Sequence, residues 1–230
     1  MRRYIAEALG TFALVFTGTG AIVINDVTAG GVSHVGIALT FGLIVMALIY
    51  AIGDVSGAHL NPAVTVGFVV ARRLRVRFLA PYILSQFAGA LLASVALLCM
   101  FGNHAGLGAT TPFGSGWQSF ALEGVLTGIL MFVILCVSTG PKEVGTAAGI
   151  AIGGVVGLEA LFAGPISGAS MNPARSLAPA IVSGHLSSLW IYLTAPFLGS
   201  VIAVPLWMAT RPSTRTYEPS EKPILKEVKA

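Results

Sequence analysis

Apolar residues fill the chain in long runs, and polar residues gather between the runs. Six runs reach the length of a membrane span, since a hydrocarbon layer of about 30 Å needs roughly 20 helical residues. None of these runs contains Lys or Arg. They cover residues 4–24, 33–52, 79–101, 118–138, 145–163 and 188–209. The pattern predicts an all-α membrane protein with six transmembrane helices.

A polar phrase that occurs twice interrupts this pattern. It reads SGAHLNPAVTVG over residues 56–67 and SGASMNPARSLA over residues 167–178. In each copy, Asn followed by Pro indicates a helix start, because Asn caps free backbone N–H groups and Pro fits the first helical position. About ten mostly apolar residues follow, enough for a helix of about 15 Å, or half a membrane. Each copy therefore predicts a re-entrant half-helix.

The segments around the two phrases also correspond to each other. AEALGTFALVF, with Glu7, opens the first run, and ALEGVLTGILMF, with Glu123, opens the fourth. Each unit has three runs, so the second unit enters the membrane from the opposite side and the units are inverted repeats. We expect a single transmembrane domain over residues 1–210, with repeats at about 4–101 and 118–209.

Two inverted half-helices would meet at the membrane midplane with their N-termini facing each other. Each N-terminus carries about half a positive charge and free N–H groups, so the meeting point repels cations. A neutral hydroxylic molecule can instead accept a hydrogen bond from each Asn amide. Irregular backbone at this depth needs protein or a water-filled cavity around it, which predicts a pore. The predicted pore residues are Asn61, Pro62, Ala63, Asn172, Pro173 and Ala174.

Basic residues mark one side of the predicted bundle. Twelve of the 13 Lys and Arg residues lie in segments that six spans bring to the same side, whereas residues 25–32, 102–117 and 182–187 contain none. The positive-inside rule then makes both termini cytoplasmic. The exception is Arg175, in the second copy of the phrase. Residues 211–230, rich in Pro, Lys and Glu, are predicted to be a disordered cytoplasmic tail.

The composition also restricts location and partners. The chain is 55% hydrophobic and 10% charged, with a net charge of +4. Because nearly all basic residues lie on one predicted side of the membrane, the expected partner is a lipid bilayer and not a nucleic acid. Arg2 and Arg3 precede the first run as in a signal peptide. That run is too long for one and lacks a cleavage site, so we expect a retained helix. The expected location is a plasma membrane or a bacterial inner membrane.

Catalytic and metal-binding patterns are not found in the sequence. Cys99 and Cys136 lie inside predicted spans without CxxC spacing, which is typical of packing residues. The histidines have no ligand spacing, and no nucleophile–base pair or phosphate-binding loop stands out. We expect neither an enzyme nor a metal or other cofactor. The histidines are His34, His59, His104 and His185.

Both NPA boxes, with AEALGTF, GAHLNPAVT, SQFAGA and GASMNPARS, resemble the aquaporin or major intrinsic protein family of membrane channels. The resemblance covers about residues 4–209. It implies a passive channel and a homotetramer. Glu7 and Glu123 match buried glutamates that hold the re-entrant loops in this family. As intramembrane acids they are also candidates for a proton relay.

The resemblance further implies a constriction formed by four side chains, which spacing from the boxes places at Phe41, Ala160, Ala169 and Arg175. Water-specific members carry His at the position of Ala160, and glycerol facilitators carry an aromatic residue at that of Ala169. One aromatic residue and two alanines predict a wider, partly apolar filter, to which Arg175 adds hydrogen-bond donors and a barrier to cations. We therefore expect passage of water and small uncharged solutes.

With AGPISGASMNPARSLAPA, the chain looks most like the nodulin-like intrinsic proteins of plants and their bacterial relatives, a group that passes glycerol and uncharged metalloid acids. The alternatives are a strictly water-selective aquaporin, a proton-coupled secondary transporter with similar repeats, and a structural protein that does not conduct. Glu159, beside the filter, is expected to pair with a loop donor or to line the outer mouth. Asp54 is expected to cap the backbone or to be solvated at the cytoplasmic vestibule.

Overall fold

The computed structural model describes residues 1–138 and 147–210, and the predicted tail and Lys142 lie outside them. Within this part of the chain, six helices are long and apolar enough to cross a membrane. Two shorter helices begin at the prolines of the two phrases. The predicted all-α architecture with two half-helices is thus confirmed. The helices are α1 (Arg2–Val27), α2 (Ser33–Ser56), α3 (Pro62–Val70), α4 (Leu79–Phe101), α5 (Gly116–Ser138), α7 (Ala148–Ser167), α8 (Pro173–Ser183) and α9 (Leu189–Thr210).

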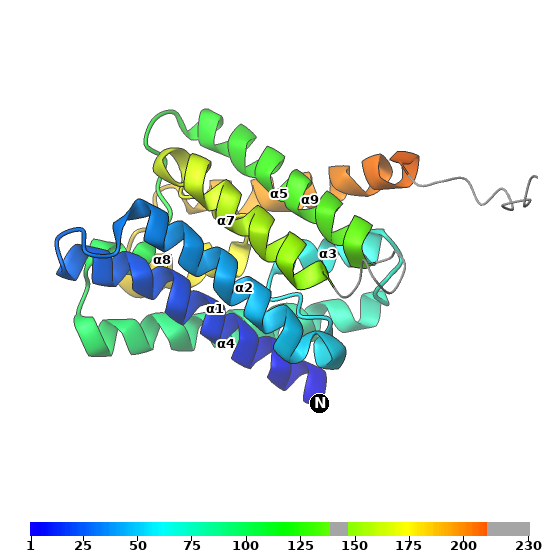
Figure 1. Cartoon of the computed structure of the whole chain (residues 1–230), viewed down its shortest axis with the longest axis horizontal. Helices are drawn as coiled ribbons and strands as arrows, with labels where there is room; N and C mark the ends of the chain where they lie inside the picture. Colours follow the sequence, from blue (N-terminus) through cyan, green and yellow to red (C-terminus); the bar gives the residue numbers. More distant parts are fainter. Residues whose placement is uncertain (139–146, 211–230) are drawn as a thin grey trace, which may run out of the picture.

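The helices pack as two equivalent sets (Figure 1). In the first set α1 packs on α4, and in the second α5 packs on α9. The two sets meet mainly through α2 and α7. Each half-helix contacts the last span of the other set, α3 against α9 and α8 against α4. This exchange brings both half-helices into the centre of the bundle, as inverted repeats require.

Two glycines allow the tightest helix contacts. A Cβ atom on Gly89 of α4 would lie 2.1 Å from the Ala8 carbonyl oxygen of α1. On Gly199 of α9 it would lie 2.0 Å from the Gly124 carbonyl oxygen of α5. Both distances are far inside van der Waals contact, so only glycine fits. Close backbone approach at small residues stabilises helix pairs in lipid, where apolar side chains gain little from association.

Large apolar side chains cover the outside of the bundle as well as filling its core. Leu9, Leu43, Leu92 and Leu158 are each more than half exposed on four different spans. Such a surface is unfavourable in water and matches a hydrocarbon environment. A cluster of aromatic rings formed by Trp117, Phe120 and Trp190 lies where α5 and α9 begin, as at a membrane interface. The molecule is a multi-pass membrane protein.

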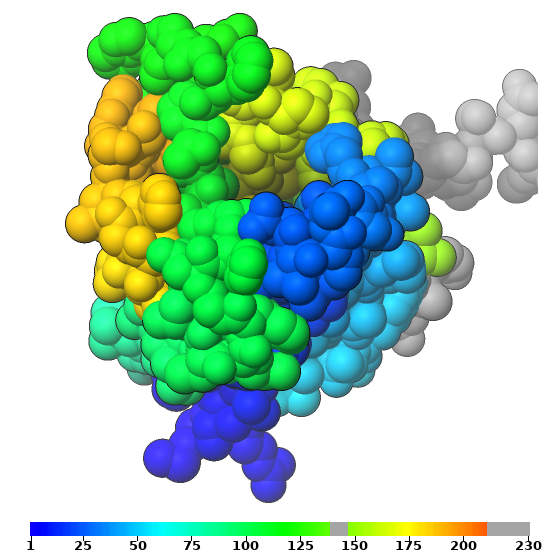
Figure 2. All heavy atoms as spheres, turned by 90° about the vertical axis from the view of Figure 1, so that its left-hand side faces the viewer, coloured from blue at the N-terminus to red at the C-terminus, as the bar shows by residue number. Residues whose placement is uncertain are grey.

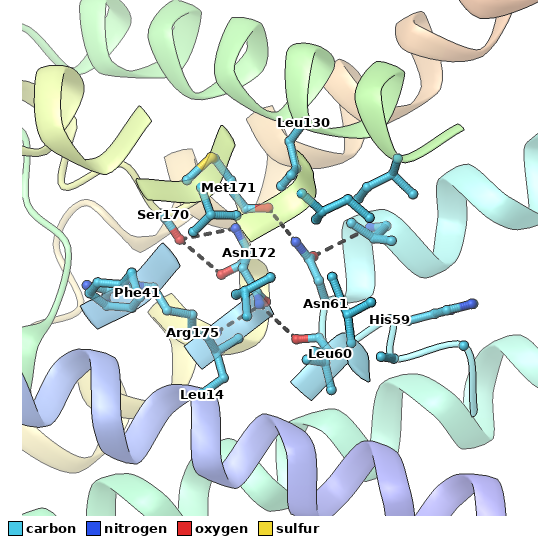
Figure 3. A pocket seen from close by; sticks show the side chains of 18 of the residues that line it. Leu14, Phe41, His59, Leu60, Asn61, Leu130, Ser170, Met171, Asn172 and Arg175 are labelled. Atoms are coloured by element: carbon cyan, nitrogen blue, oxygen red, sulfur yellow. Dashed lines mark hydrogen bonds between the residues drawn. The ribbon is translucent and has the colours of Figure 1, made fainter. Parts of the chain in front are cut away.

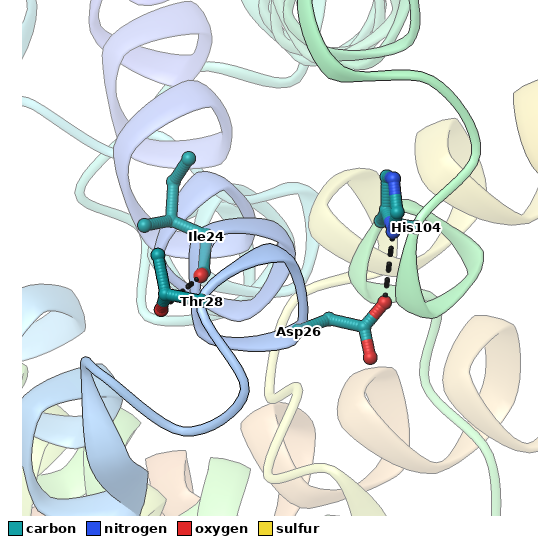
Figure 4. A network of polar contacts seen from close by, with 4 residues as sticks. All are labelled: Ile24, Asp26, Thr28 and His104. Carbon is teal, nitrogen blue, oxygen red and sulfur yellow. Dashed lines mark hydrogen bonds and ion pairs between the residues drawn. The ribbon is translucent and has the colours of Figure 1, made fainter.

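We call the end that carries residues 28–32 and 102–115 the α1–α2 end. There His104 Nδ1 lies 3.0 Å from Asp26 Oδ2, and Thr28 Oγ1 donates a 2.6 Å hydrogen bond to the Ile24 carbonyl (Figure 4). The contact between His104 and Asp26 fastens the 102–108 segment to the last turn of α1. Figure 2 shows the surface at this end hollowed between the segment leading into α5, the end of α7 and the α1–α2 connection.

Candidate functional site

Both asparagines of the repeated phrase cap their half-helices, as predicted from the sequence. The Asn61 Oδ1 atom accepts hydrogen bonds from the backbone N–H groups of Ala63 at 2.8 Å and Val64 at 3.5 Å. Asn172 Oδ1 accepts from the next residues of α8 in the same way, at 3.0 and 3.3 Å. Both asparagines have extended backbone and are followed by Pro at the first helical position. Such a cap contributes about 1 kcal/mol to a helix.

The amide nitrogens of the two asparagines link the two loops to each other (Figure 3). Asn61 Nδ2 donates a 2.8 Å hydrogen bond to the Met171 carbonyl, and Asn172 Nδ2 donates one of 2.8 Å to the Leu60 carbonyl. An amide group has two N–H donors. One donor of each asparagine is therefore used between the loops, and only the second remains for a solute. The sequence did not reveal this cross-link.

The two loops share an unusual backbone conformation before their caps. Ala58 and Leu60 have positive φ angles of 46° and 54°, and Ala169 and Met171 have φ angles of 40° and 54°. These values lie in the left-handed region, which costs a residue with a side chain about 1 kcal/mol or more. Such strain persists only where the surroundings fix the backbone. Three buried side chains per loop supply that restraint.

Glu7 and Glu123 each accept two backbone N–H groups from the neighbouring loop. The Glu7 carboxylate accepts from His59 at 2.9 Å and from Leu60 at 2.8 Å. Glu123 accepts from Ser170 at 2.9 Å and Met171 at 2.7 Å. Both carboxylates are fully buried. Charge-assisted hydrogen bonds of this kind are about twice as strong as neutral ones, so each glutamate fixes the two residues before a cap.

Two tyrosines and two serines complete the support, and they were missed in the sequence. The Tyr82 hydroxyl donates to the Ser56 carbonyl at 2.8 Å, and the Tyr192 hydroxyl donates to the Ser167 carbonyl at 2.6 Å. Ser56 and Ser167 in turn accept from the N–H group two residues later. The internal repeat contained the signal, because the tyrosines and the serines are separated by nearly the same number of residues as the asparagines.

A cavity lies between the loops and the helices α2, α5 and α7. Phe41, Ala160, Ala169 and Arg175, the four predicted filter residues, all line it, together with Asn61 and Asn172. The remaining residues of the boxes, Pro62, Ala63, Pro173 and Ala174, are buried and do not line it. The rest of the wall is mainly apolar and includes Val45, Ile49, Leu130, Ile134, Ile152 and Val156.

Among the described residues, Arg175 alone places a guanidinium group in the cavity wall. It is 3% exposed, and its Nη1 donates a 2.7 Å hydrogen bond to the Gly108 carbonyl. Its guanidinium carbon lies 5.0 Å from the centroid of the Phe41 ring, a distance typical of a cation–π contact. Among the described residues it forms no ion pair. One of its five N–H donors is thus committed to Gly108, and its positive charge is not neutralised by a bridging carboxylate.

His59 lies at the other end of the cavity from Phe41 (Figure 3). Its ring stacks on Phe68 at 4.5 Å between centroids, and its Nδ1 lies 3.2 Å from Thr65 Oγ1. The side chain is therefore held against α3. Together with Asn61 and Ser138, it adds a polar group to a wall that is otherwise mainly apolar on this side.

Glu159 and Asp54 differ in their surroundings. Glu159 is 4% exposed, yet neither carboxylate oxygen has a hydrogen-bond partner among the described residues, and the residue does not line the cavity. Both expectations for it, pairing with a loop donor and lining the outer mouth, were wrong for this structure. The sequence cannot show which face of a helix a single carboxylate takes. Asp54 is exposed in the last turn of α2, consistent with solvation.

Comparisons with known proteins agree with this geometry. The profile of the family described as major intrinsic protein matches residues 1–207. Aquaporin NIP1-4 of Oryza sativa subsp. japonica is 50% identical over 201 residues, which cover 87% of this chain and 73% of that protein. Nodulin-26 of Glycine max is 43% identical over 202 residues, with 87% and 74% covered. The X-ray structure of the aquaglyceroporin from Plasmodium falciparum superposes with a TM-score of 0.81 at 27% identity, covering 90% of this chain and 94% of that one. The chain therefore belongs to the major intrinsic protein family, whose members are aquaporin channels and not enzymes.

Proposed function

We propose that the protein is a passive channel for water and small uncharged solutes, glycerol-like polyols and metalloid acids among them. The observation that carries this proposal is the size of the side chains at the four filter positions. Ala160 and Ala169 line the same cavity as Phe41 and Arg175. In the same cavity wall, two methyl groups and one aromatic ring leave more width than a His or a second aromatic residue would.

The polar groups in the cavity suit an uncharged hydroxylic solute. Arg175 and the free N–H donors of Asn61 and Asn172 offer hydrogen bonds along one side, and the opposite wall is apolar. The hydroxyl groups of a polyol or of an undissociated metalloid acid can accept hydrogen bonds from the polar side. The hydrocarbon part of the polyol, or the flat face of the acid, can contact the apolar wall. The name of the structural neighbour, an aquaglyceroporin, supports the same class of solute.

Ion and proton exclusion follows, in this proposal, from positive charge at two depths. The N-termini of α3 and α8 meet at the asparagines, and each carries about half a positive charge. Arg175 adds a full charge near Phe41. A cation would have to lose its hydration water while facing both, and the described residues that line the cavity include no carboxylate. This barrier favours a channel over a proton-coupled transporter.

The test is stopped-flow light scattering of vesicles that contain the purified protein, with gradients of water, glycerol, urea and boric or arsenous acid. We expect fast flux of water and glycerol that is linear in the gradient. In the Ala160→His variant, glycerol flux should fall at least tenfold more than water flux, because the imidazole would narrow the filter. Ala160→Val, a smaller increase in size, is the matched control and should have an intermediate effect.

Each alternative predicts a different result. A strictly water-selective pore would show no glycerol flux in the parent protein, and a transporter would show saturable, proton-driven flux. A structural protein would not accelerate osmotic shrinkage. Equal loss of water and glycerol flux in Ala160→His would contradict the assignment of Ala160 to the filter.

We also propose that residues 1–210 form one channel domain and that four copies assemble into a homotetramer. The proposed location is a plasma membrane or a bacterial inner membrane, with both termini cytoplasmic. The distribution of arginines supports the orientation, because the exposed arginines lie at the end opposite to the α1–α2 connection. Glu7 and Glu123 are proposed as structural supports of the loops, because their hydrogen bonds go to backbone N–H groups.

A further inference from the structure

A cluster of exposed arginines lies at the end of the molecule opposite to the α1–α2 end. We call it the arginine patch. It joins the start of α1 to the segment between α3 and α4, and Figure 1 places the N-terminus and the start of α4 toward the same end. All six side chains are exposed. They are Arg2, Arg3, Arg72, Arg73, Arg75 and Arg77.

Aromatic rings hold part of the patch in place. Arg3 and Arg77 both lie over the ring of Phe78, each with its guanidinium carbon 4.8 Å from the ring centroid. Arg73 lies 5.8 Å from the ring of Trp207 in the same way. Cation–π contacts fix a guanidinium without neutralising it, and they leave its N–H edge available. Three positive charges are thereby ordered where α1 and α4 begin and where α9 ends.

This patch is not paired with acidic side chains in the part of the chain that the structure describes. None of its arginines forms an ion pair among the described residues. Glu7, the nearest acid along α1, is fully buried and binds the loop backbone. Residues 211–230 contain five Lys or Arg against three Glu, so their composition adds positive charge. The unpaired guanidinium groups are therefore available to an external anion.

We propose that the arginine patch binds the headgroups of anionic phospholipids. The arginines border the starts of two candidate spans, Arg2–Val27 and Val76–Phe101. The ends of membrane spans meet the headgroup layer, where the lipid phosphates lie. Guanidinium groups bind phosphate oxygens in pairs, and a juxtamembrane cluster of four to eight basic residues attracts anionic lipid with about a fivefold preference per residue. The proposal concerns a surface outside the channel and does not depend on which solute passes.

Trp207 makes the proposal directly measurable, because it lies under Arg73 whereas Trp117 and Trp190 lie at the other end. In a Trp117→Phe/Trp190→Phe background, Trp207 is the single tryptophan reporter. The probes are vesicles of phosphatidylcholine that contain brominated phosphatidylglycerol or, at the same mole fraction, brominated phosphatidylcholine. We expect the brominated anionic lipid to quench Trp207 fluorescence much more strongly.

The test variant is Arg72→Gln/Arg75→Gln/Arg77→Gln, which leaves Arg73 over the reporter. The preference for the anionic lipid should fall at least about tenfold. The matched control is Lys222→Gln/Lys226→Gln/Lys229→Gln, which removes the same charge elsewhere and should keep the preference. Equal loss in both variants would show a general charge effect and overturn the proposal, as would an unchanged preference in the first.

Two further arms separate the remaining explanations. Soluble glycerol phosphate should not reduce the quenching difference, and a reduction would identify a site for free phosphate instead of lipid. If the triple variant is not recovered in folded form, salt provides the same test on the parent protein. Raising the ionic strength shortens the Debye length from about 30 Å at 0.01 M to about 3 Å at 1 M, so the preference should disappear. Its persistence would contradict a headgroup interaction.

Discussion

Two buried glutamates, Glu123 and Glu159, show how strongly a carboxylate depends on its neighbours. Glu123 accepts hydrogen bonds from Ser167, Ser170 and Met171, whereas both oxygens of Glu159 lack a partner within residues 1–138 and 147–210. A buried polar group without a hydrogen bond costs roughly 1–3 kcal/mol in proteins. The first glutamate therefore stabilises the fold, and the second destabilises it.

Replacing each of these glutamates by Met should change stability in opposite directions. Glu159→Met removes the unpartnered carboxyl and keeps the volume, so thermal unfolding in detergent should shift upward by a few degrees. Glu123→Met leaves two backbone N–H groups and one hydroxyl without an acceptor. The free energy of unfolding should therefore fall by roughly 2–4 kcal/mol. Size-exclusion chromatography after a heating series measures both. A loss of stability in Glu159→Met would mean that its carboxyl has a partner in the membrane.

The elements differ in how much of their geometry could be predicted from the sequence. The Asn-Pro caps of α3 and α8 depend only on neighbouring residues, so they were predicted correctly together with the six spans. The hydrogen bond from Arg175 to the Gly108 carbonyl joins residues that are 67 positions apart in the sequence. Gly108 lies in the segment between α4 and α5, where the sequence has no regular pattern. Nothing local indicates it, and the same holds for the cross-link between the asparagine amides and the opposite loop.

The hydrogen bond between Arg175 and the Gly108 carbonyl can be tested by a substitution at Gly108. It has a positive φ of 74°, and a Cβ atom there would lie 2.9 Å from Thr19 Cβ. Gly108→Ala should therefore push the segment away from α1 and remove the acceptor from Arg175. We expect a lower energetic barrier to cations, seen as a severalfold faster proton leak in vesicles loaded with a pH-sensitive dye, while water flux remains.

Gly106→Ala is the matched control for this change. Gly106 also has positive φ, 55°, and the atoms nearest to a Cβ there belong to the His185 side chain, at 3.2 Å. Its backbone strain is similar, but its carbonyl accepts no hydrogen bond from Arg175. The control should leak no more than the parent protein. Equal leaks in both variants would assign the effect to the segment as a whole instead of the Gly108 carbonyl.

At the scale of the whole molecule, the inverted repeat determines which segments of the chain lie on the same face of the membrane. Each set contains three spans, so residues 102–115 and the arginine patch must lie on opposite faces of the membrane. Crossing with the opposite orientation would place six exposed arginines outside and reverse the positive-inside distribution. The proposed orientation therefore puts Ser115 outside the cell and Arg75 in the cytoplasm.

Cysteine labelling distinguishes these arrangements. In a background with Cys99→Ala and Cys136→Ala, we introduce either Ser115→Cys or Arg75→Cys, both at exposed positions. A membrane-impermeant maleimide should label Ser115→Cys in intact cells and Arg75→Cys only after permeabilisation, because the bilayer separates the two ends. The reverse labelling would overturn the orientation and leave the fold intact. Labelling of both positions from outside would contradict the odd number of spans in each set, on which the meeting of the two half-helices depends.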